Sequence, residues 1–134
     1  MIFVDTNLLV RLATNDVPAD RDAVAQLLER NETRIPKTVL LETEWVLRSR
    51  YRYSSEQVLA FFEYLAGLSS VYLEDEESVR WAMGAAATGI DFADAMHLAM
   101  AAAANEHFYT FDPTLHRKAS RLKGASVRLL RQKA

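Results

Sequence analysis

The chain has 134 residues, of which half are apolar and a quarter are charged, and its formal net charge is −2. These values are typical of one globular domain with a sizeable core, and the charge argues against a general nucleic-acid-binding protein. The absence of cysteine excludes disulfides, thiol catalysis and cysteine-ligated zinc, and without a long apolar run or a signal peptide we expect one cytoplasmic domain over residues 1–134.

The first half of the chain alternates short β-rich runs with helical patterns. A short apolar run opens the sequence, and Thr6, a residue type that favours helix starts, follows it directly. Ser54 and Gln57 stand three apart at the start of a later helix, which is the spacing of a capping box. In chain order the predicted elements are a strand over 2–5, helices over 6–14 and 18–31, a strand over 33–37, and helices over 38–51 and 54–68.

The second half continues this alternation. Its predicted elements are a strand over 71–75, helices over 76–87 and 91–106, a strand over 107–111, a helix over 113–123, and a strand over 126–130. Short apolar strands separated by helices favour parallel strands joined by right-handed crossovers and covered on both faces. We therefore predict an α/β fold with three α/β/α layers and a central, mostly parallel sheet of four or five short strands.

Four carboxylates follow strand ends or begin helices. Asp5 and Asp112 come at the ends of apolar strands, and Glu42 and Asp94 lie in the first turns of helices. Sites in a parallel sheet form beyond the carboxyl ends of its strands, so these side chains would converge if their strands are neighbours. Converged carboxylates repel one another unless a cation compensates their charge, and an all-oxygen set suits Mg²⁺ or Mn²⁺. Such ions can activate water for phosphodiester cleavage.

Most of these acids also have a plainer interpretation. Asp5 could cap the helix that follows it, and Asp112 stands before Pro113 in a standard turn pair. Glu42 could be a surface residue. Its rival, Glu44, is predicted to be the more exposed of the two, because the apolar neighbours of Glu42 indicate a largely buried helix.

Asp91 and Asp94 stand three apart at the head of an alanine-rich helix. Asp91 fits the N-cap position, where its carboxylate can accept backbone hydrogen bonds from the first turn. Asp94 would occupy the N3 position, where a carboxylate can turn back to the cap or bind a metal but does not readily do both. We predict a cap for Asp91 and a metal ligand for Asp94. His97, one turn further on, is predicted to be a packed residue or one that supports a ligand by a hydrogen bond, rather than a ligand itself.

The motifs FVDTN, LLETEWVLR, DFADAMHLAMA and TFD, in this order and at these intervals, resemble those of PIN-domain nucleases, and most closely the VapC-type toxins of toxin–antitoxin pairs. The resemblance covers essentially the whole chain. It implies that Asp5, Glu42, Asp94 and Asp112 are catalytic and that Asp5, Asp94 and Asp112 hold Mg²⁺ or Mn²⁺. The residues implied to orient these carboxylates, by hydrogen bonds or through water, are Thr6, Asn7, Asp91 and Thr110.

The resemblance further implies a metal-dependent endoribonuclease that acts as a toxin, forms a homodimer and is blocked by a cognate antitoxin through a basic side chain. A second hypothesis is a weakly active or inactive binding module whose acidic pocket captures that basic side chain. A third, an aspartyl-phosphate enzyme with Asp5 as nucleophile, is disfavoured because Asn7 stands where such enzymes need an aspartate. No membrane partner is expected.

Two surfaces leave alternatives open. The helix over 54–68 carries more apolar side chains than one core-facing stripe needs, so the surplus could bind a partner or could simply be buried. The C-terminal segment is basic and has no acid, which is typical of a solvated face but would also suit a polyanionic substrate. Its basic residues are Arg117, Lys118, Arg121, Lys123, Arg128, Arg131 and Lys133.

Overall fold

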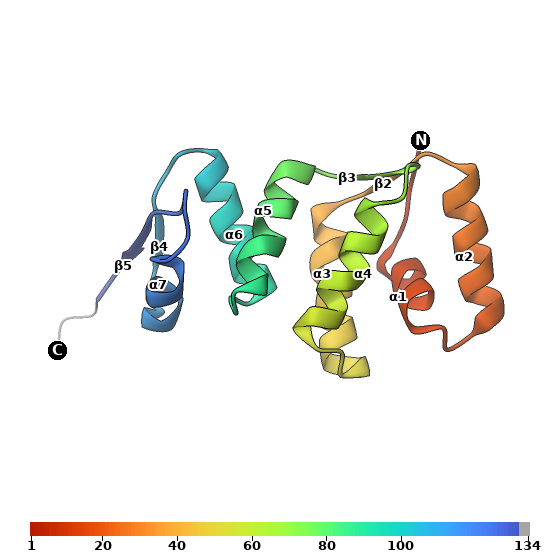
Figure 1. Cartoon of the computed structure of the whole chain (residues 1–134), viewed down its shortest axis with the longest axis horizontal. Coiled ribbons are helices and arrows are strands. Elements are labelled where there is room, and N and C mark those ends of the chain that lie inside the picture. Colours follow the sequence, from red (N-terminus) through yellow and green to blue (C-terminus); the bar gives the residue numbers. More distant parts are fainter. Residues whose placement is uncertain (132–134) are drawn as a thin grey trace. The chain divides into compact units, whose positions relative to one another are not determined.

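The computed structural model describes residues 1–131, and Lys133 of the basic segment therefore lies outside the described residues. The chain divides into two compact units, and the first of them ends at Glu76 (Figure 1). The boundary falls at the start of helix α5 (Glu76–Ala87). Each unit has its own helices and parallel strands, and the expectation of a single domain over the whole chain stays a prediction.

A three-stranded parallel sheet forms the centre of the first unit. Its strands are β1 (Ile2–Phe3), β2 (Thr33–Ile35) and β3 (Val71–Leu73), in the order β1-β2-β3. Ile2 lies opposite Thr33, which in turn lies opposite Val71. The strands are shorter than predicted, and β2 shows one reason. Pro36 has no backbone N–H to donate to a ladder, so the strand ends before it and a helix begins after it.

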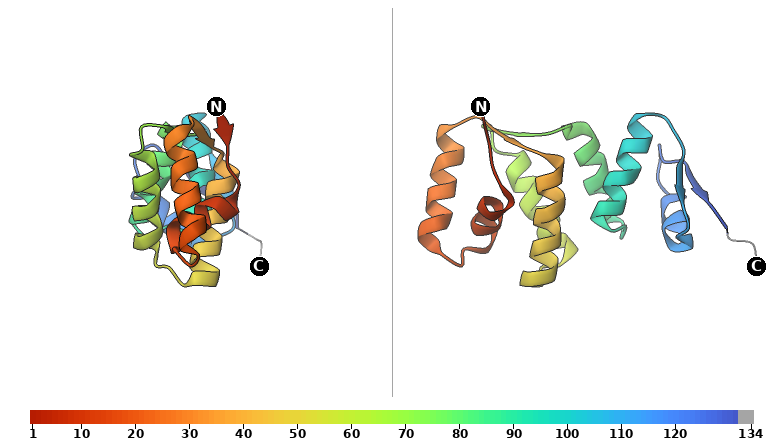
Figure 2. Two further views of the ribbon diagram at one scale, coloured as in Figure 1. Left: turned by 90° about the vertical axis from the view of Figure 1, so that its right-hand side faces the viewer. Right: turned by 180° about the vertical axis from the view of Figure 1, so that it is seen from behind.

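Four helices pack around this sheet. They are α1 (Thr6–Thr14), α2 (Pro18–Arg30), α3 (Lys37–Tyr51) and α4 (Ser55–Ala66). Helix α1 contacts α2 and α3, and α4 contacts both α3 and β3 (Figures 1 and 2). The fully buried side chains that hold these elements together are Leu9, Ile35, Leu40, Leu47, Val58, Phe62 and Leu65.

Helix α4 begins with the predicted capping box. The Ser54 side chain accepts a hydrogen bond from the Gln57 backbone at 3.1 Å, and the Gln57 side chain accepts one from the Ser54 backbone at 2.8 Å. Two backbone donors that the helix cannot satisfy internally are thus paired at its start. The prediction made from the spacing of these two residues is confirmed.

The orientation of α3 differs from the prediction. Its buried positions are Leu40, Thr43, Glu44 and Leu47, which recur at the spacing of one helix face, whereas Trp45 is 53% exposed. The expectation that Glu44 is more exposed than Glu42 is therefore wrong. Glu44 tolerates burial because the Arg48 guanidinium, one turn away, donates to both of its carboxylate oxygens.

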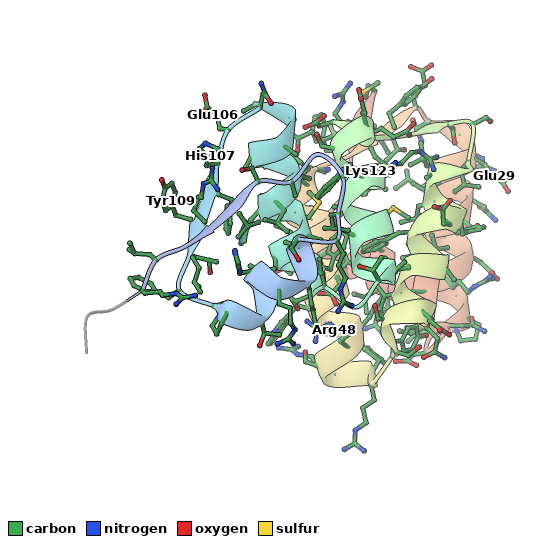
Figure 3. The ribbon with its side chains drawn as sticks, turned by 60° about the vertical axis from the view of Figure 1, so that its left-hand side comes forward. Glu29, Arg48, Glu106, His107, Tyr109 and Lys123 are labelled. Carbon is green, nitrogen blue, oxygen red and sulfur yellow. The ribbon has the colours of Figure 1, made fainter. Side chains whose placement is uncertain are left out.

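The second unit pairs two strands through one helix. Strands β4 (Phe108–Thr110) and β5 (Val127–Leu129) are parallel, with Phe108 opposite Val127, and helix α7 (Pro113–Ala119) connects them and packs on both. Helices α5 and α6 (Phe92–Ala103) precede this ladder. Both helices contribute buried alanines, which are Ala82, Ala85, Ala86, Ala95 and Ala99. Figure 3 shows Tyr109 of β4 with its neighbours Glu106 and His107.

All twelve predicted elements are present, and the α/β class with five short parallel strands is confirmed. The strands occur as a three-stranded sheet in the first unit and a two-stranded ladder in the second. None of the helices in residues 1–131 is long and apolar enough to cross a membrane.

Candidate metal centre

In the first unit, Asp5 is held at the N-terminus of α1. Val4, buried after strand β1, brings the chain to this point, and Asp5 then takes the extended N-cap conformation. Its Oδ1 accepts a hydrogen bond from the backbone of Thr6 at 2.7 Å. The capping interpretation of Asp5 thus describes the structure. It does not exclude metal binding, because only one of the two carboxylate oxygens is engaged.

Thr6 connects Asp5 to Glu42. Its buried hydroxyl donates to a carboxylate oxygen of Glu42, while its backbone N–H donates to Asp5. One residue of α1 therefore orients two of the candidate carboxylates, from α1 and α3. Asn7 lies exposed on α1, beside a cleft of about 420 Å³ that α1 and α2 line together.

In the second unit, Asp91 caps α6 as predicted. Its Oδ2 accepts a hydrogen bond from the Asp94 backbone at 3.2 Å. The structure shows no reciprocal hydrogen bond from the Asp91 backbone to the Asp94 carboxylate, so the described residues contain no capping box here. The Asp94 carboxylate is not committed to the cap, which leaves it available for the predicted ligand role.

Asp112 caps α7, and Pro113 occupies the first position of that helix, where its missing N–H costs nothing. Asp112 Oδ1 accepts hydrogen bonds from the backbones of Thr114, at 2.9 Å, and Leu115, at 3.2 Å. Thr110 accepts a hydrogen bond from the Asp112 backbone at 3.1 Å. Thr110 thus positions the Asp112 main chain rather than the carboxylate itself.

The three aspartates of the second unit line one hollow of about 190 Å³. Burial raises the pKa of Asp94, and the negative charges of Asp91 and Asp112 raise it further, whereas His97 opposes the shift. The His97 ring stacks on Phe108 with 6.4 Å between ring centroids, although His97 itself is exposed. The complete lining of the hollow is Ile90, Asp91, Asp94, Asp112, Thr114, Leu115 and Lys118.

The chemistry of this hollow fits a hard divalent cation. Its acidic side chains offer carboxylate oxygens as metal ligands, and a bound cation would relieve the repulsion between their negative charges. Asp5 and Glu42 belong to the first unit, and Asp94 and Asp112 to the second. Within residues 1–131, no three acidic or histidine side chains form a ready metal cluster. The assignment of individual ligands stays a prediction.

Two features escaped the sequence analysis. Lys118 belongs to the basic C-terminal segment in the sequence, yet it lines the same hollow as three aspartates in the folded unit. Its position in the helix that the candidate Asp112 begins is the signal that could have identified it. The pairing of Glu44 with Arg48 was also missed. The same spacing of four residues indicates that ion pair.

The parallel α/β fold and the acidic hollow at the start of α6 place the chain among α/β proteins whose sites are built from carboxylates. Within that class, residues 2–121 match the PIN domain, and the match runs through both units. The chain belongs to the PIN domain family, whose members are generally metal-dependent nucleases. A search of curated proteins found no match to the chain.

Proposed function

We propose that this protein is a Mg²⁺- or Mn²⁺-dependent endoribonuclease and the toxin of a toxin–antitoxin pair. The observation that carries the nuclease proposal is the hollow lined by Asp91, Asp94 and Asp112, where burial and then the neighbouring negative charges raise the pKa of Asp94. Family membership supports nuclease chemistry in general. The resemblance of the four sequence motifs to VapC-type toxins supports the finer assignment to RNA and to a toxin role.

In this proposal Asp5, Asp94 and Asp112 hold the cation, and Glu42 is a further catalytic carboxylate. The ion, when bound, would supply a water activated for attack on phosphorus. Thr6 orients Glu42 through its hydroxyl and Asp5 through its backbone, and Asp91 fixes the start of the helix that carries Asp94. Hydrolysis in which the 3′-oxygen leaves gives 5′-phosphate and 3′-hydroxyl ends.

Cleavage of RNA by wild-type protein and by Asp94→Asn tests the proposal. Mutation of a residue that only hydrogen-bonds to a metal ligand lowers metal affinity or activity by about 10–100-fold. Loss of a ligand itself should therefore lower the cleavage rate by more than about 100-fold. Asp22→Asn, at an exposed position of α2, is the matched control and should cleave normally. Mg²⁺ should restore wild-type activity after EDTA treatment. Full activity of Asp94→Asn, or of the wild type in EDTA, would rule the mechanism out.

The competing hypothesis is a binding module whose acidic residues mainly capture a basic side chain of an antitoxin. Titration calorimetry with Mn²⁺ separates the two hypotheses. The nuclease should bind the ion with an affinity that Asp94→Asn weakens, while an isolated protein that binds no Mn²⁺ at millimolar concentration favours the module.

A further inference from the structure

Lys118 is the positively charged side chain that lines the acidic hollow. It lies in the last turn of α7, and it shares the lining with Asp91, Asp94, Asp112 and Thr114. A lysine beside three carboxylates would be expected to pair with one of them. Among residues 1–131, however, Lys118 forms no ion pair with any of these aspartates, and its side chain is exposed.

A backbone carbonyl holds the Lys118 ammonium instead. The Nζ atom donates to the oxygen of Gly89 at 2.9 Å. Gly89 has a φ of +107°, in the region that favours glycine, in the turn that leads from α5 to Asp91. An ammonium group has three donors, so this hydrogen bond leaves two N–H groups for another acceptor. The contact thus fixes the position of a positive charge without neutralising it.

We propose that Lys118 binds a non-bridging phosphate oxygen of the RNA substrate at the acidic hollow. This inference rests on the proposed nuclease function. A phosphodiester that approaches three aspartates is repelled by their negative charges, and a bound cation would offset part of that repulsion. A lysine that keeps its charge and two free donors supplies a second attraction, because lysine binds phosphate as a point charge.

A purely structural role is the rival explanation. The hydrogen bond from Lys118 also ties α7 to the turn before α6, and loss of that tie alone would lower stability. Lys118→Arg keeps the charge, whereas Lys118→Gln removes it and keeps a donor. Lys123→Gln is the matched control, because Lys123 is exposed in the segment between α7 and β5 and does not line the hollow (Figure 3).

The test measures the affinity of each variant for a fluorescein-labelled single-stranded RNA by anisotropy, in EDTA and in Ca²⁺, over a range of salt concentrations. We expect Lys118→Gln to bind about tenfold more weakly, the loss of one charged hydrogen bond. The slope of log affinity against log salt should become shallower by about 0.7, the value for one phosphate contact to a single strand. Lys118→Arg should bind nearly as well as wild type.

An equal loss of RNA affinity in Lys118→Gln and Lys123→Gln would overturn the inference, because the general positive charge of the surface would then account for both losses. So would a fall in melting temperature without a change in RNA affinity, or a wild-type protein that binds no RNA in either buffer. Failure of the nuclease proposal would give a different result. RNA would not be cleaved in Mg²⁺, while the RNA affinity that depends on Lys118 would remain.

Discussion

Asp94 combines an unfavourable environment with a proposed function. Burial, first, and then the charge of Asp91 and Asp112 favour the protonated carboxyl and raise the pKa of Asp94, although His97 acts in the opposite direction. An acid with a raised pKa in the folded state lowers stability once it ionises. The metal-free protein should therefore lose stability as pH rises through the ordinary aspartate range and up to the raised pKa of Asp94.

Asp94→Asn is consequently expected to raise the melting temperature of the metal-free protein at neutral pH. Mn²⁺ at a concentration about 100 times its Kd should raise the melting temperature of the wild type by about 10 °C. The same variant should lose this stabilisation. In the wild type, metal binding should weaken on acidification at a higher pH than for an ordinary aspartate. Thermal melts with EDTA and with Mn²⁺ measure both effects, and an Asn variant stabilised by Mn²⁺ as much as wild type would exclude Asp94 as a ligand.

Glu42 and Glu44 make a sharp comparison, because they stand two residues apart on α3 with opposite exposure. Glu42→Gln keeps an acceptor for the Thr6 hydroxyl, so the free energy of unfolding should change by less than about 0.5 kcal/mol while RNA cleavage is lost. Glu44→Gln weakens a buried charged hydrogen bond to Arg48 and should cost about 1–3 kcal/mol, with normal cleavage by the folded protein.

Urea denaturation and initial cleavage rates distinguish these outcomes. If Glu44→Gln abolished cleavage without a change in stability, Glu44 rather than Glu42 would be the catalytic glutamate. The comparison thus tests the transfer of the family motif onto Glu42 independently of any metal measurement.

At the scale of whole elements, three of the candidate aspartates begin helices. Asp5, Asp91 and Asp112 cap α1, α6 and α7, and each accepts a backbone hydrogen bond from the first turn. The partial positive charge of a helix N-terminus stabilises a carboxylate there. Capping also limits the conformations of the side chain, so it orients the second carboxylate oxygen. Cap and ligand are therefore compatible roles for one aspartate.

The capping box of α4 gives an element-scale prediction that does not involve the site. Ser54→Ala removes the side-chain oxygen that accepts from Gln57, and it should lower the free energy of unfolding by about 1 kcal/mol. Cleavage by the folded protein should not change. Urea denaturation measures the loss, with Ser55→Ala, just inside the helix, as control. Equal stability of Ser54→Ala and wild type would mean that the cap contributes little.

At the scale of the whole molecule, α4 carries apolar side chains beyond its buried stripe, and Tyr64 is the exposed large one among them. Val58, Phe62 and Leu65 form its buried stripe, whereas Tyr64 is 50% exposed and stacks on Phe61 with 6.3 Å between ring centroids. We expect a homodimer through this surplus apolar surface. Tyr64→Glu should raise the dimer dissociation constant by about 10–30-fold, as for loss of an aromatic anchor, while Tyr64→Phe should not. Size-exclusion chromatography with light scattering measures this, and a monomeric wild type at high micromolar concentration would contradict it.

Local patterns were sufficient to place the elements. Hydrophobic periodicity located all seven helices of residues 1–131, and residue types at helix starts identified the cap at Asp91 and the capping box at Ser54. These features depend on residues within a few positions of each other, which is why they can be read from the chain alone. The strands were predicted to be longer than they are. A strand ends where its pairing partner ends, and that partner is distant in sequence.

The sequence by itself determined the α/β class, the order of the elements, and four acids that match a nuclease family. Only the tertiary structure decided which side of α3 is buried, that Thr6 joins Asp5 to Glu42, and that Lys118 lies among aspartates. The physical reason is distance along the chain. Thr6 and Glu42 are 36 residues apart, and Lys118 and Gly89 are 29 apart, so the packing of whole elements brings them together.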